Sequence, residues 1–473
     1  MSGTVDLAII GAGPAGMSAA YHARTHGLSV VLLDEQPTPG GQVYRGIATA
    51  RDPRLDAILG KDYAFGEEIY RRFAACGADY RPGSTVWRIG AEGLSLISTG
   101  RSDDLLARRT LVATGAMERP FPAKGWTLPG VMTAGAAQIL LKTSRLVAED
   151  AVFIGCGPLL YLVAYQYLKA GVAIRAILDT APRENLLPAA ACLPGALRQP
   201  GYIAKGLRMI AALRLSGIRI HRNIRSVSFS GKDRLDTVHW RDKAGEQTLE
   251  CTEAFVHQGV IPNVNMTMST GCRHVWDEGQ LCWRPELDAF GRTSHEWLMV
   301  AGDGGGIGGA RSAALSGAIA ALAAARDLGR LDAGAFESES APLLAARRRD
   351  LAVRPFLDRL YRPLPGFRVP EDEEAVICRC EEVTCGDVAR AVGEGCPGPN
   401  QLKSFTRAGM GPCQGRLCGH TVTETIARLS GRAPQEVGYY RIRTPIKPVT
   451  VGDIAGRTEN AEQGAEHEQA AAH

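Results

Sequence analysis

The sequence contains no hydrophobic segment long enough to cross a membrane. No window of about 18 residues is uninterruptedly apolar, whereas a transmembrane helix needs about 20 such residues. A signal peptide is not expected either, because the first predicted strand already begins at residue 5 and no basic stretch precedes it. We therefore expect a cytoplasmic protein without an integral membrane segment, for which only peripheral contact with the inner membrane face is left open.

The sequence also lacks an excess of either charge. Its 54 basic and 50 acidic residues give a net charge of +4 without a long basic run, so nucleic acid is not an expected partner. Disulfides are not expected, because cytoplasmic thiols are kept reduced. The 12 cysteines are unevenly spread, however, since six of them fall within residues 378–418. A chain of 473 residues is expected to form two or three domains.

The N-terminal segment carries a dinucleotide-binding pattern. An apolar strand runs into Gly11-Ala12-Gly13-Pro14-Ala15-Gly16, a helix-forming stretch follows, and a second strand over 28–33 ends at Asp34 and Glu35. In such a unit the first glycine permits a tight turn, the second lets the backbone approach a pyrophosphate, and the third allows close helix–strand packing. Asp34 lies 23 residues after Gly11, where a carboxylate can bind a ribose hydroxyl.

Three further segments are expected to complete an FAD site. They are a turn-rich loop ending at Gln42, the strand end Ala113-Thr114-Gly115, and the strand end Gly302-Asp303. Asp303 is predicted to accept a hydrogen bond from a ribityl hydroxyl, and the helix after it would direct its N-terminus at the cofactor. The predicted cofactor-binding residues are Gly11, Gly13, Pro14, Ala15, Gly16, Asp34, Glu35, Gln36, Gly41, Gln42, Val86, Ala113, Thr114, Gly115, Gly302 and Asp303.

Residues 151–179 repeat the opening pattern in altered form. The loop reads Gly155-Cys156-Gly157-Pro158-Leu159-Leu160, and the following strand ends at Asp179. Leu160 puts a bulky side chain where the third glycine would let helix and strand pack. We therefore expect the fold to be retained here without assigning NAD(P)H to it. No Cys-x-x-Cys motif lies nearby, which argues against a thioredoxin-reductase-like disulfide site.

Two close cysteine pairs predict a metal centre near the C-terminus. Cys378-x-Cys380 and Cys413-x4-Cys418 are separated by 32 residues. Four thiolates suit either zinc or a [2Fe–2S] cluster. The two-residue spacing usual for structural zinc is missing, and a flavin in the same chain favours an electron carrier, so we predict a [2Fe–2S] cluster held by these four cysteines. No residue is predicted to act as a catalytic acid, base or nucleophile.

Several motifs resemble one known family. The C-terminal segment resembles the bacterioferritin-associated-ferredoxin-like [2Fe–2S] domain through Cys378-x-Cys380, Lys403-Ser404-Phe405-Thr406-Arg407 and Gly409-Met410-Gly411-x-Cys413-Gln414-Gly415-Arg416-x-Cys418. The rest resembles the A (alpha) subunits of opine oxidases, the B subunit of hydrogen cyanide synthase, and the alpha subunits of dye-linked proline and D-hydroxyproline dehydrogenases, through Asp34-Glu35-Gln36, Gly40-Gly41-Gln42 and Trp126-x-Leu128-Pro129-Gly130-Val131. The alpha subunit of heterotetrameric sarcosine oxidase is a more distant relative.

The resemblance covers residues 5–450 and implies an electron-transfer role. A separate flavoprotein (beta) subunit of amino-acid-oxidase type would oxidise the C–N bond of an amino acid, imino acid or opine. This chain would then pass the electrons through FAD and [2Fe–2S] to an external acceptor. Some family members hold another nucleotide in the FAD-like site, and some place an FMN at a subunit interface. A small third subunit is left open as a further partner. The alternatives are a stand-alone NAD(P)H-dependent flavin and iron–sulfur reductase, and a non-enzymatic iron-handling or docking module.

The expected fold is α/β. It comprises two nested Rossmann-like dinucleotide-binding domains, as in glutathione and thioredoxin reductases, and a small, mainly helical [2Fe–2S] domain. The predicted boundaries are a split FAD-binding domain at 1–120 and 258–330, a second Rossmann-like domain at 121–257, a linker at 331–370, the [2Fe–2S] domain at 371–435, a C-terminal segment at 436–455 and a disordered tail at 456–473.

Overall fold

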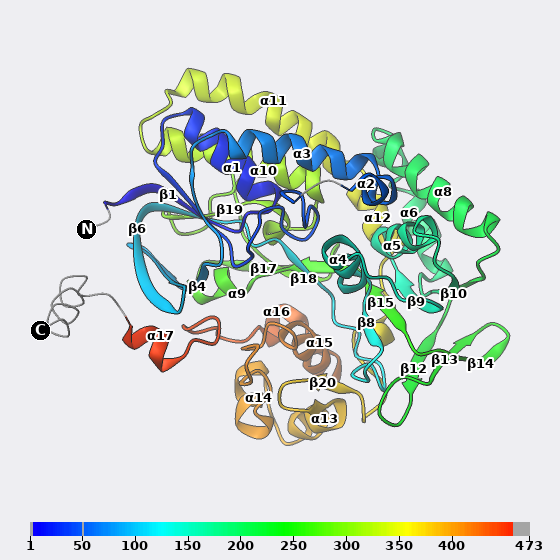
Figure 1. Cartoon of the computed structure of the whole chain (residues 1–473). Coiled ribbons are helices and arrows are strands. Elements are labelled where there is room, and N and C mark those ends of the chain that lie inside the picture. Colours follow the sequence, from blue (N-terminus) through cyan, green and yellow to red (C-terminus); the bar gives the residue numbers. More distant parts are fainter. Residues whose placement is uncertain (1–2, 50–51, 457–473) are drawn as a thin grey trace, which may run out of the picture.

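Residues 3–49 and 52–456 are described by the structure, a computed structural model of the chain (Figure 1). The predicted disordered tail lies outside the described residues from position 457 onward. Figure 1 shows two α/β units side by side and a small helical domain, coloured orange to red, that lies along one side of them. Within the described ranges, no helix is long and apolar enough to span a membrane.

The first unit is built on a seven-stranded sheet with the order β3-β2-β1-β6-β5-β4, in which β19 also pairs with β6. Strand β2 runs parallel to β1 and β3, and β1 and β19 run parallel to the C-terminal part of β6. Strands β4 and β5 extend the sheet in antiparallel pairing. The central strands β1 and β2 are buried almost throughout, which explains their continuous apolar sequences. The strands are β1 (Val5–Ile10), β2 (Val30–Leu33), β3 (Asp79–Arg81), β4 (Thr85–Gly90), β5 (Gly93–Ser98), β6 (Arg101–Val112) and β19 (Leu298–Val300).

Two helices of this unit approach each other at backbone distance. A Cβ at Gly317 of α10 would lie 2.0 Å from the carbonyl oxygen of Ala15 in α1, so a larger residue could not be placed there without displacing a helix. The contact holds the N-terminal turn of α1 beside α10. The helices are α1 (Pro14–Thr25), α2 (Pro53–Leu59), α3 (Lys61–Ala74), α10 (Ala310–Asp327) and α11 (Ala333–Leu351), with the 3-10 turn η2 (Gly302–Gly305) before α10.

The second unit has a five-stranded parallel sheet with the order β11-β10-β9-β15-β8 and a three-stranded antiparallel sheet, β12-β13-β14. Its strands are β8 (Val131–Thr133), β9 (Ala151–Cys156), β10 (Ile174–Asp179), β11 (Ile220–Arg222), β12 (Ser226–Ser230), β13 (Thr237–Asp242), β14 (Gly245–Glu250) and β15 (Ala254–Gln258). Its helices are α4 (Ala134–Ser144), α5 (Pro158–Lys169), η1 (Arg183–Asn185), α6 (Leu186–Ala190), α7 (Leu193–Ala196) and α8 (Pro200–Leu215). The predicted α/β fold with two nested Rossmann-like units is confirmed.

The chain leaves the first unit and returns to it through one antiparallel ribbon. Its strands are β7 (Ala116–Glu118) and β16 (Val260–Pro262). The short helix α9 (Asn265–Ser269) and the hairpin β17 (His274–Asp277) and β18 (Cys282–Pro285) follow the return. This ribbon brings the segment after Gly115 close to the helical domain, where the buried contacts described below are made.

The segment that was predicted as a linker, 331–370, is folded and packed. It forms α11, α12 (Arg354–Leu360) and the 3-10 turn η3 (Pro365–Phe367). The side-chain amide of Asn185 in the second unit donates to the carbonyl oxygens of Leu360 and Arg362. The segment is therefore part of the α/β body, and prolines lie within α11 and in the first turn of α12 and of η3.

The small C-terminal domain shares its core with the first unit. Its elements are β20 (Val376–Cys378), β21 (Val383–Thr384), α13 (Cys385–Gly393), α14 (Pro399–Thr406), α15 (Gly419–Ser430), α16 (Pro434–Val437) and α17 (Val451–Ala455). Buried side chains such as Ile377 and Val422 belong to the same hydrophobic cluster as Ala8 and Leu94 of the first sheet. The cluster continues past residue 435 to Ile446, whose N–H donates to the carbonyl of Trp87.

Candidate functional site

The glycine loop between β1 and α1 has the geometry that the sequence predicts. Gly11 has a φ of +105°, and a Cβ at that position would lie 2.6 Å from the carbonyl oxygen of Ala113. A Cβ at Gly16 would lie 1.9 Å from the carbonyl oxygen of Gly11. Around Gly13, by contrast, the nearest atom to a Cβ would be 3.9 Å away, at Gly41. Two of the three glycines thus serve the fold, while the middle one leaves space in front of the helix N-terminus.

Asp34 at the end of β2 fixes this loop. Its carboxylate accepts hydrogen bonds from the backbone N–H groups of Ala12, at 2.6 Å, and of Gln36, at 2.7 Å. The acid is therefore held at the edge of the glycine loop, where a ribose would meet it. Its neighbour Glu35 points elsewhere, because it forms an ion pair with Lys447 of the C-terminal segment.

The loop around Gly41 is held in place by a buried lysine. Lys142 in α4 donates to the carbonyl oxygens of Gln42 and Val43, at 3.1 and 2.8 Å, and burial lowers the pKa of Lys142 to about 7. Gln42 itself is exposed, and its side-chain oxygen accepts from Arg45. Sequence analysis did not identify Lys142, although a lysine that follows Ile139-Leu140-Leu141 in a helix is a signal of burial.

The strand ends Ala113-Thr114-Gly115 and Gly302-Asp303 come together beside the first loop. A Cβ at Gly302 would lie 3.0 Å from the Cβ of Ala15, and one at Gly304 would lie 3.4 Å from the carbonyl oxygen of Gly115. Val86, the remaining predicted residue, is buried in β4 within the hydrophobic core. The glycine loop, the loop at Gly41 and the two strand ends therefore converge. Val86 is packed in the core, and its contact with the cofactor stays a prediction.

Polar groups at this junction are available to form hydrogen bonds with a ligand. One carboxylate oxygen of Asp303 accepts from the backbone N–H groups of Gly308 and Gly309, both at 2.9 Å. The hydroxyl of Thr114 and the Nε of Arg45 are buried without a hydrogen-bond partner among the described residues. A buried polar group of this kind is costly unless something binds it. With the open space at Gly13, these groups fit an FAD-type dinucleotide.

A cavity of about 680 Å³ adjoins Asp303, between η2, α10, the β17–β18 hairpin and α12. It is lined by five arginines and five carboxylates, among them Arg354 and Asp358. Several of these charges are already paired, such as Arg284 with Asp277 at 2.9 Å. The cavity therefore carries no strong preference for an anion or a cation.

In the second unit, the groups that correspond to the first nucleotide site contact other parts of the chain. Asp179, at the end of β10, accepts from the hydroxyl of Tyr161, at 2.7 Å, and from the backbone N–H of Ala181. The buried thiol of Cys156, in the glycine loop, faces the carbonyl oxygen of Tyr361 at 3.4 Å. Leu160 is fully buried. The groups that would meet a nucleotide are thus occupied by protein contacts.

The four predicted ligand cysteines are neighbours in the folded domain. The thiol of Cys418 interacts with those of Cys378 and Cys413, and the thiol of Cys413 interacts with that of Cys380. Cys378 and Cys418 are buried, Cys413 is half-buried and Cys380 is exposed. The two pairs that lie 32 residues apart in the sequence therefore form one sulfur cluster.

The sulfurs differ in the charge that their surroundings favour, because burial raises the pKa of Cys380 and the contacts with Cys378 and Cys413 raise that of Cys418. The interaction with Cys418 lowers the pKa of Cys378 to about 6 and that of Cys413 to about 5. Backbone N–H groups contribute, from Gly409 to Cys378 and from Leu417 to Cys413. In the described part of the chain, no group of three or more His, Cys, Asp or Glu side chains is placed so that it could hold a metal ion. Four neighbouring cysteines with N–H donors are the kind of ligand set that an iron–sulfur cluster uses.

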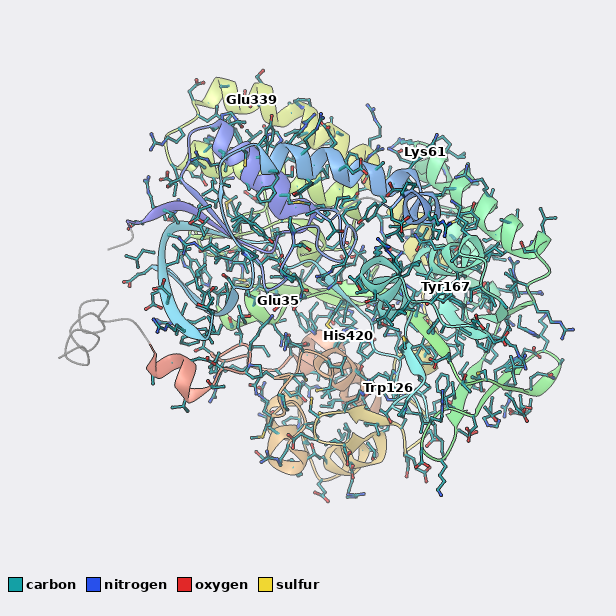
Figure 2. The ribbon with its side chains drawn as sticks, viewed as in Figure 1. Glu35, Lys61, Trp126, Tyr167, Glu339 and His420 are labelled. Atoms are coloured by element: carbon teal, nitrogen blue, oxygen red, sulfur yellow. The ribbon has the colours of Figure 1, made fainter. Side chains whose placement is uncertain are left out.

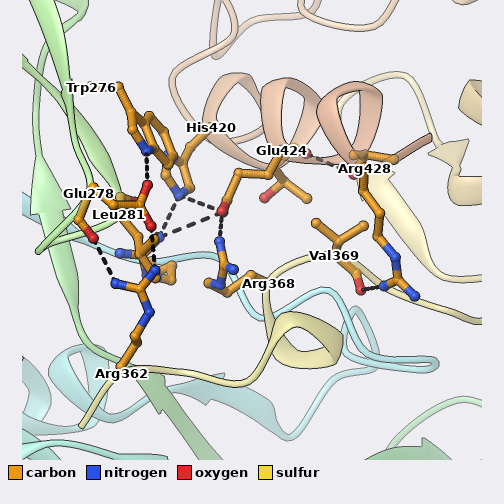
Figure 3. A network of polar contacts seen from close by, with 12 residues as sticks. Trp276, Glu278, Leu281, Arg362, Arg368, Val369, His420, Glu424 and Arg428 are labelled. Atoms are coloured by element: carbon orange, nitrogen blue, oxygen red, sulfur yellow. Dashed lines mark hydrogen bonds and ion pairs between the residues drawn. The ribbon is translucent and has the colours of Figure 1, made fainter. Parts of the chain in front are cut away.

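A buried polar network fixes the helix that follows Cys418 (Figure 3). Arg119, just after β7, donates to the carbonyl oxygens of Gln258, Gln280 and Leu281, at 3.2, 2.8 and 3.0 Å, and contacts His420. Figure 3 shows His420 and Glu424 on α15, where Glu424 pairs with Arg368 and lies 2.9 Å from His420. Trp276 stacks on His420 with ring centroids 5.6 Å apart. His420 thus lies at the junction of the helical domain and the α/β body (Figure 2).

We expect the Arg119→Met variant to lose about 3–5 kcal/mol of stability, because it leaves three buried carbonyl oxygens without their donor and removes one of the two guanidinium groups beside the buried Glu424. Arg119 is 4% exposed, and its guanidinium binds three carbonyl oxygens. The measurement is urea unfolding followed by tryptophan fluorescence, since Trp276 reports on this contact.

The matched control is Arg428→Met on α15, the helix that Arg119 contacts through His420. Arg428 is 44% exposed and pairs with Glu371, which is 73% exposed, so its loss is expected to cost no more than about 1 kcal/mol. Equal midpoints for the two variants would contradict the role given to the buried network.

Comparison with known proteins agrees with this geometry. Residues 5–318 match the family profile "Pyridine nucleotide-disulphide oxidoreductase", and residues 372–457 match "Sarcosine oxidase A3 domain". The A subunit of opine oxidase from Rhizobium meliloti is 43% identical over 95% of this chain and 87% of its own length. The HcnB subunit of hydrogen cyanide synthase from Pseudomonas aeruginosa is 35% identical over 93% of this chain and 96% of its own length.

The fold has a counterpart among solved structures. The crystal structure of L-proline dehydrogenase from P. horikoshii covers 95% of this chain, and 79% of that chain is matched, with a TM-score of 0.68 at 20% identity. That identity supports the fold alone. The two profile matches, the near-complete coverage of relatives and the geometry of the glycine loop lead to one conclusion: the chain is an oxidoreductase subunit that belongs to the pyridine nucleotide-disulphide oxidoreductases, in the family of the opine oxidase A subunits.

Proposed function

We propose that this chain is the electron-transfer subunit of a complex that oxidises the C–N bond of an amino acid, imino acid or opine. The chain would hold FAD on the first glycine loop and a [2Fe–2S] cluster on Cys378, Cys380, Cys413 and Cys418. A flavoprotein partner would carry out the substrate oxidation, and an external acceptor would receive the electrons. A flavin is suited to such a chain because it links two-electron donors to one-electron acceptors.

The observation that carries this proposal is the fixed position of the sulfur cluster against the dinucleotide-binding body. The helical domain shares a hydrophobic core with the first sheet, and the network around Arg119 anchors the helix that begins one residue after Cys418. Trp126 donates from its indole N–H to the carbonyl oxygen of Val376 in β20, at 2.7 Å. Two redox groups held at a constant separation are what an electron path requires.

Three residues would hold the FAD in the proposed arrangement. The backbone around Gly13 would receive the pyrophosphate at the N-terminus of α1. Asp34 would bind the ribose. The free carboxylate oxygen of Asp303 would accept from the ribityl chain, while its other oxygen keeps the loop to Gly309 closed.

The geometry does not favour the alternative of a stand-alone NAD(P)H-dependent reductase. A nucleotide in the second unit would have to displace the hydrogen bond from Tyr161 to Asp179 and the contact between Cys156 and Tyr361. The alternative of an iron-handling module is disfavoured as well. Only Cys380 among the four thiols is exposed, whereas Cys378 and Cys418 are each 1% exposed, so iron exchange would require the domain to open.

The proposal is tested on the complex as it is purified with its partner. Under anaerobic conditions, addition of the substrate amino acid, proline or an opine is expected to bleach the flavin absorbance and to produce the low-temperature EPR signal of a reduced [2Fe–2S] cluster. NADH or NADPH added to the same sample is expected to leave the flavin oxidised, because the second loop has the buried Leu160 in place of its third glycine.

Dithionite is the positive control, since it reduces both centres without the partner's chemistry. A preparation that contains zinc without acid-labile sulfide, or that stays EPR-silent after dithionite, would contradict the electron-transfer role. Rapid bleaching by NADH would instead support the reductase alternative.

A further inference from the structure

Tyr440 lies against the sulfur cluster from the C-terminal segment. Its ring covers two glycine turns next to the ligands, because a Cβ at Gly409 would lie 2.5 Å from the ring and one at Gly415 would lie 2.8 Å from it. Gly409 also supplies a backbone N–H to the thiol of Cys378. The tyrosine is 2% exposed, so water does not reach it.

The hydroxyl of Tyr440 is an unpartnered buried donor. Among the described residues it makes no hydrogen bond of normal geometry, and the group that it faces is the thiol of Cys418. A buried hydroxyl without a partner carries a free-energy cost, and such groups in folded proteins generally find an acceptor. An anionic sulfur in front of the ring would provide that acceptor.

The position of the ring is fixed from both sides. The side chain of Asn400 in α14 donates to the carbonyl oxygen of Tyr439 and accepts from the N–H of Arg441, at 3.1 and 2.8 Å. The ammonium group of Lys403 lies 4.9 Å from the ring centroid of Tyr440. A cation over the ring withdraws electron density and makes the phenol a stronger hydrogen-bond donor.

We propose that the hydroxyl of Tyr440 donates a hydrogen bond to a sulfur of the bound cluster, at or next to Cys418, and thereby raises the reduction potential of the cluster. The inference rests on the [2Fe–2S] cluster of the proposed function. One-electron reduction adds negative charge to the sulfurs, so a donor stabilises the reduced form more than the oxidised form. Tyr440 acts here as a positioning and tuning residue, and it exchanges no proton.

The test is an EPR-monitored redox titration of the purified complex that carries Tyr440→Phe. The ratio of reduced to oxidised cluster at a fixed potential is expected to fall about tenfold, which equals about 59 mV for one electron. Resonance Raman spectra should show Fe–S(Cys) bands that shift less in D2O in the variant than in the wild type, because the backbone N–H donors to the sulfurs remain.

Tyr439→Phe is the matched control, because its hydroxyl donates to the side-chain oxygen of Asn265 at 3.5 Å, whereas Cys413 and Cys418 act on it only through their charge. This variant is expected to shift the potential much less than Tyr440→Phe does. An unchanged potential in Tyr440→Phe, with the cluster fully loaded, would overturn the inference and leave the proposed function intact. A wild-type protein without a reducible cluster would instead remove the proposed function. If Tyr440→Phe loads poorly, 3-fluorotyrosine at position 440, a stronger donor of nearly the same size, is expected to raise the potential, and an unchanged potential in that loaded protein would overturn the inference as well.

Discussion

Replacement of Cys380 by alanine is expected to remove the iron–sulfur cluster while the rest of the protein stays folded. The thiol of Cys380 interacts with Cys413, but the side chain is exposed, so the truncation leaves no cavity in the core. Surface substitutions of this kind change stability by about 0.5 kcal/mol or less. Iron and acid-labile sulfide per chain should fall by at least about tenfold, with the flavin content unchanged, as measured by metal analysis, EPR and visible absorbance.

Cys396→Ala is the matched control in the same domain. Cys396 is 3% exposed, and its thiol contacts the carbonyl oxygen of Gly398 at 3.4 Å, without contact to the four ligands. We expect this variant to keep its cluster, although burial makes it the less stable of the two. Loss of the cluster in both variants, or retention in both, would contradict the ligand assignment.

The first loop could be predicted from sequence because its signals are local. Apolar strands, glycines at fixed spacing and an acid at the end of the next strand all lie within residues 5–34, and the structure places them as one unit. The cysteine pairs could be predicted from the sequence for another reason. Cysteines at short spacing predict a shared metal centre. The 32 residues between the two pairs fold into α13 and α14 and bring the pairs together.

The residues that sequence analysis missed act across long distances in the chain. Arg119 bridges to His420 over 301 positions, and Lys142 reaches the loop at Gln42 over 100 positions. Nothing near Arg119 in the sequence indicates burial. The segment after Asp332 was assigned as a linker from its prolines and arginines, and its contacts with the second unit, such as the hydrogen bond from Asn185 to the carbonyl oxygen of Leu360, leave no local sequence signal.

Gly13→Ala is expected to lose FAD without losing the fold. A Cβ at this position would have its nearest neighbour 3.9 Å away, at Gly41, so the apoprotein has room for it. The cost at the helix N-cap should stay below about 1 kcal/mol. The same Cβ would occupy the space through which the pyrophosphate approaches the N-terminus of α1. Bound flavin in the purified complex is expected to fall by at least about tenfold, as measured by absorbance and by FAD released on heating.

The Gly16→Ala variant distinguishes flavin loss caused by a blocked pyrophosphate site from flavin loss caused by disturbed packing. A Cβ at Gly16 would lie 1.9 Å from the carbonyl oxygen of Gly11, so α1 must move away from β1 and the thermal midpoint should fall together with the flavin content. Gly206→Ala in α8 meets no atom within 4 Å and should leave both unchanged or raise stability slightly. Full flavin in Gly13→Ala would contradict a pyrophosphate at this loop. A destabilised Gly13→Ala apoprotein would mean that the middle glycine, like its neighbours, serves the fold.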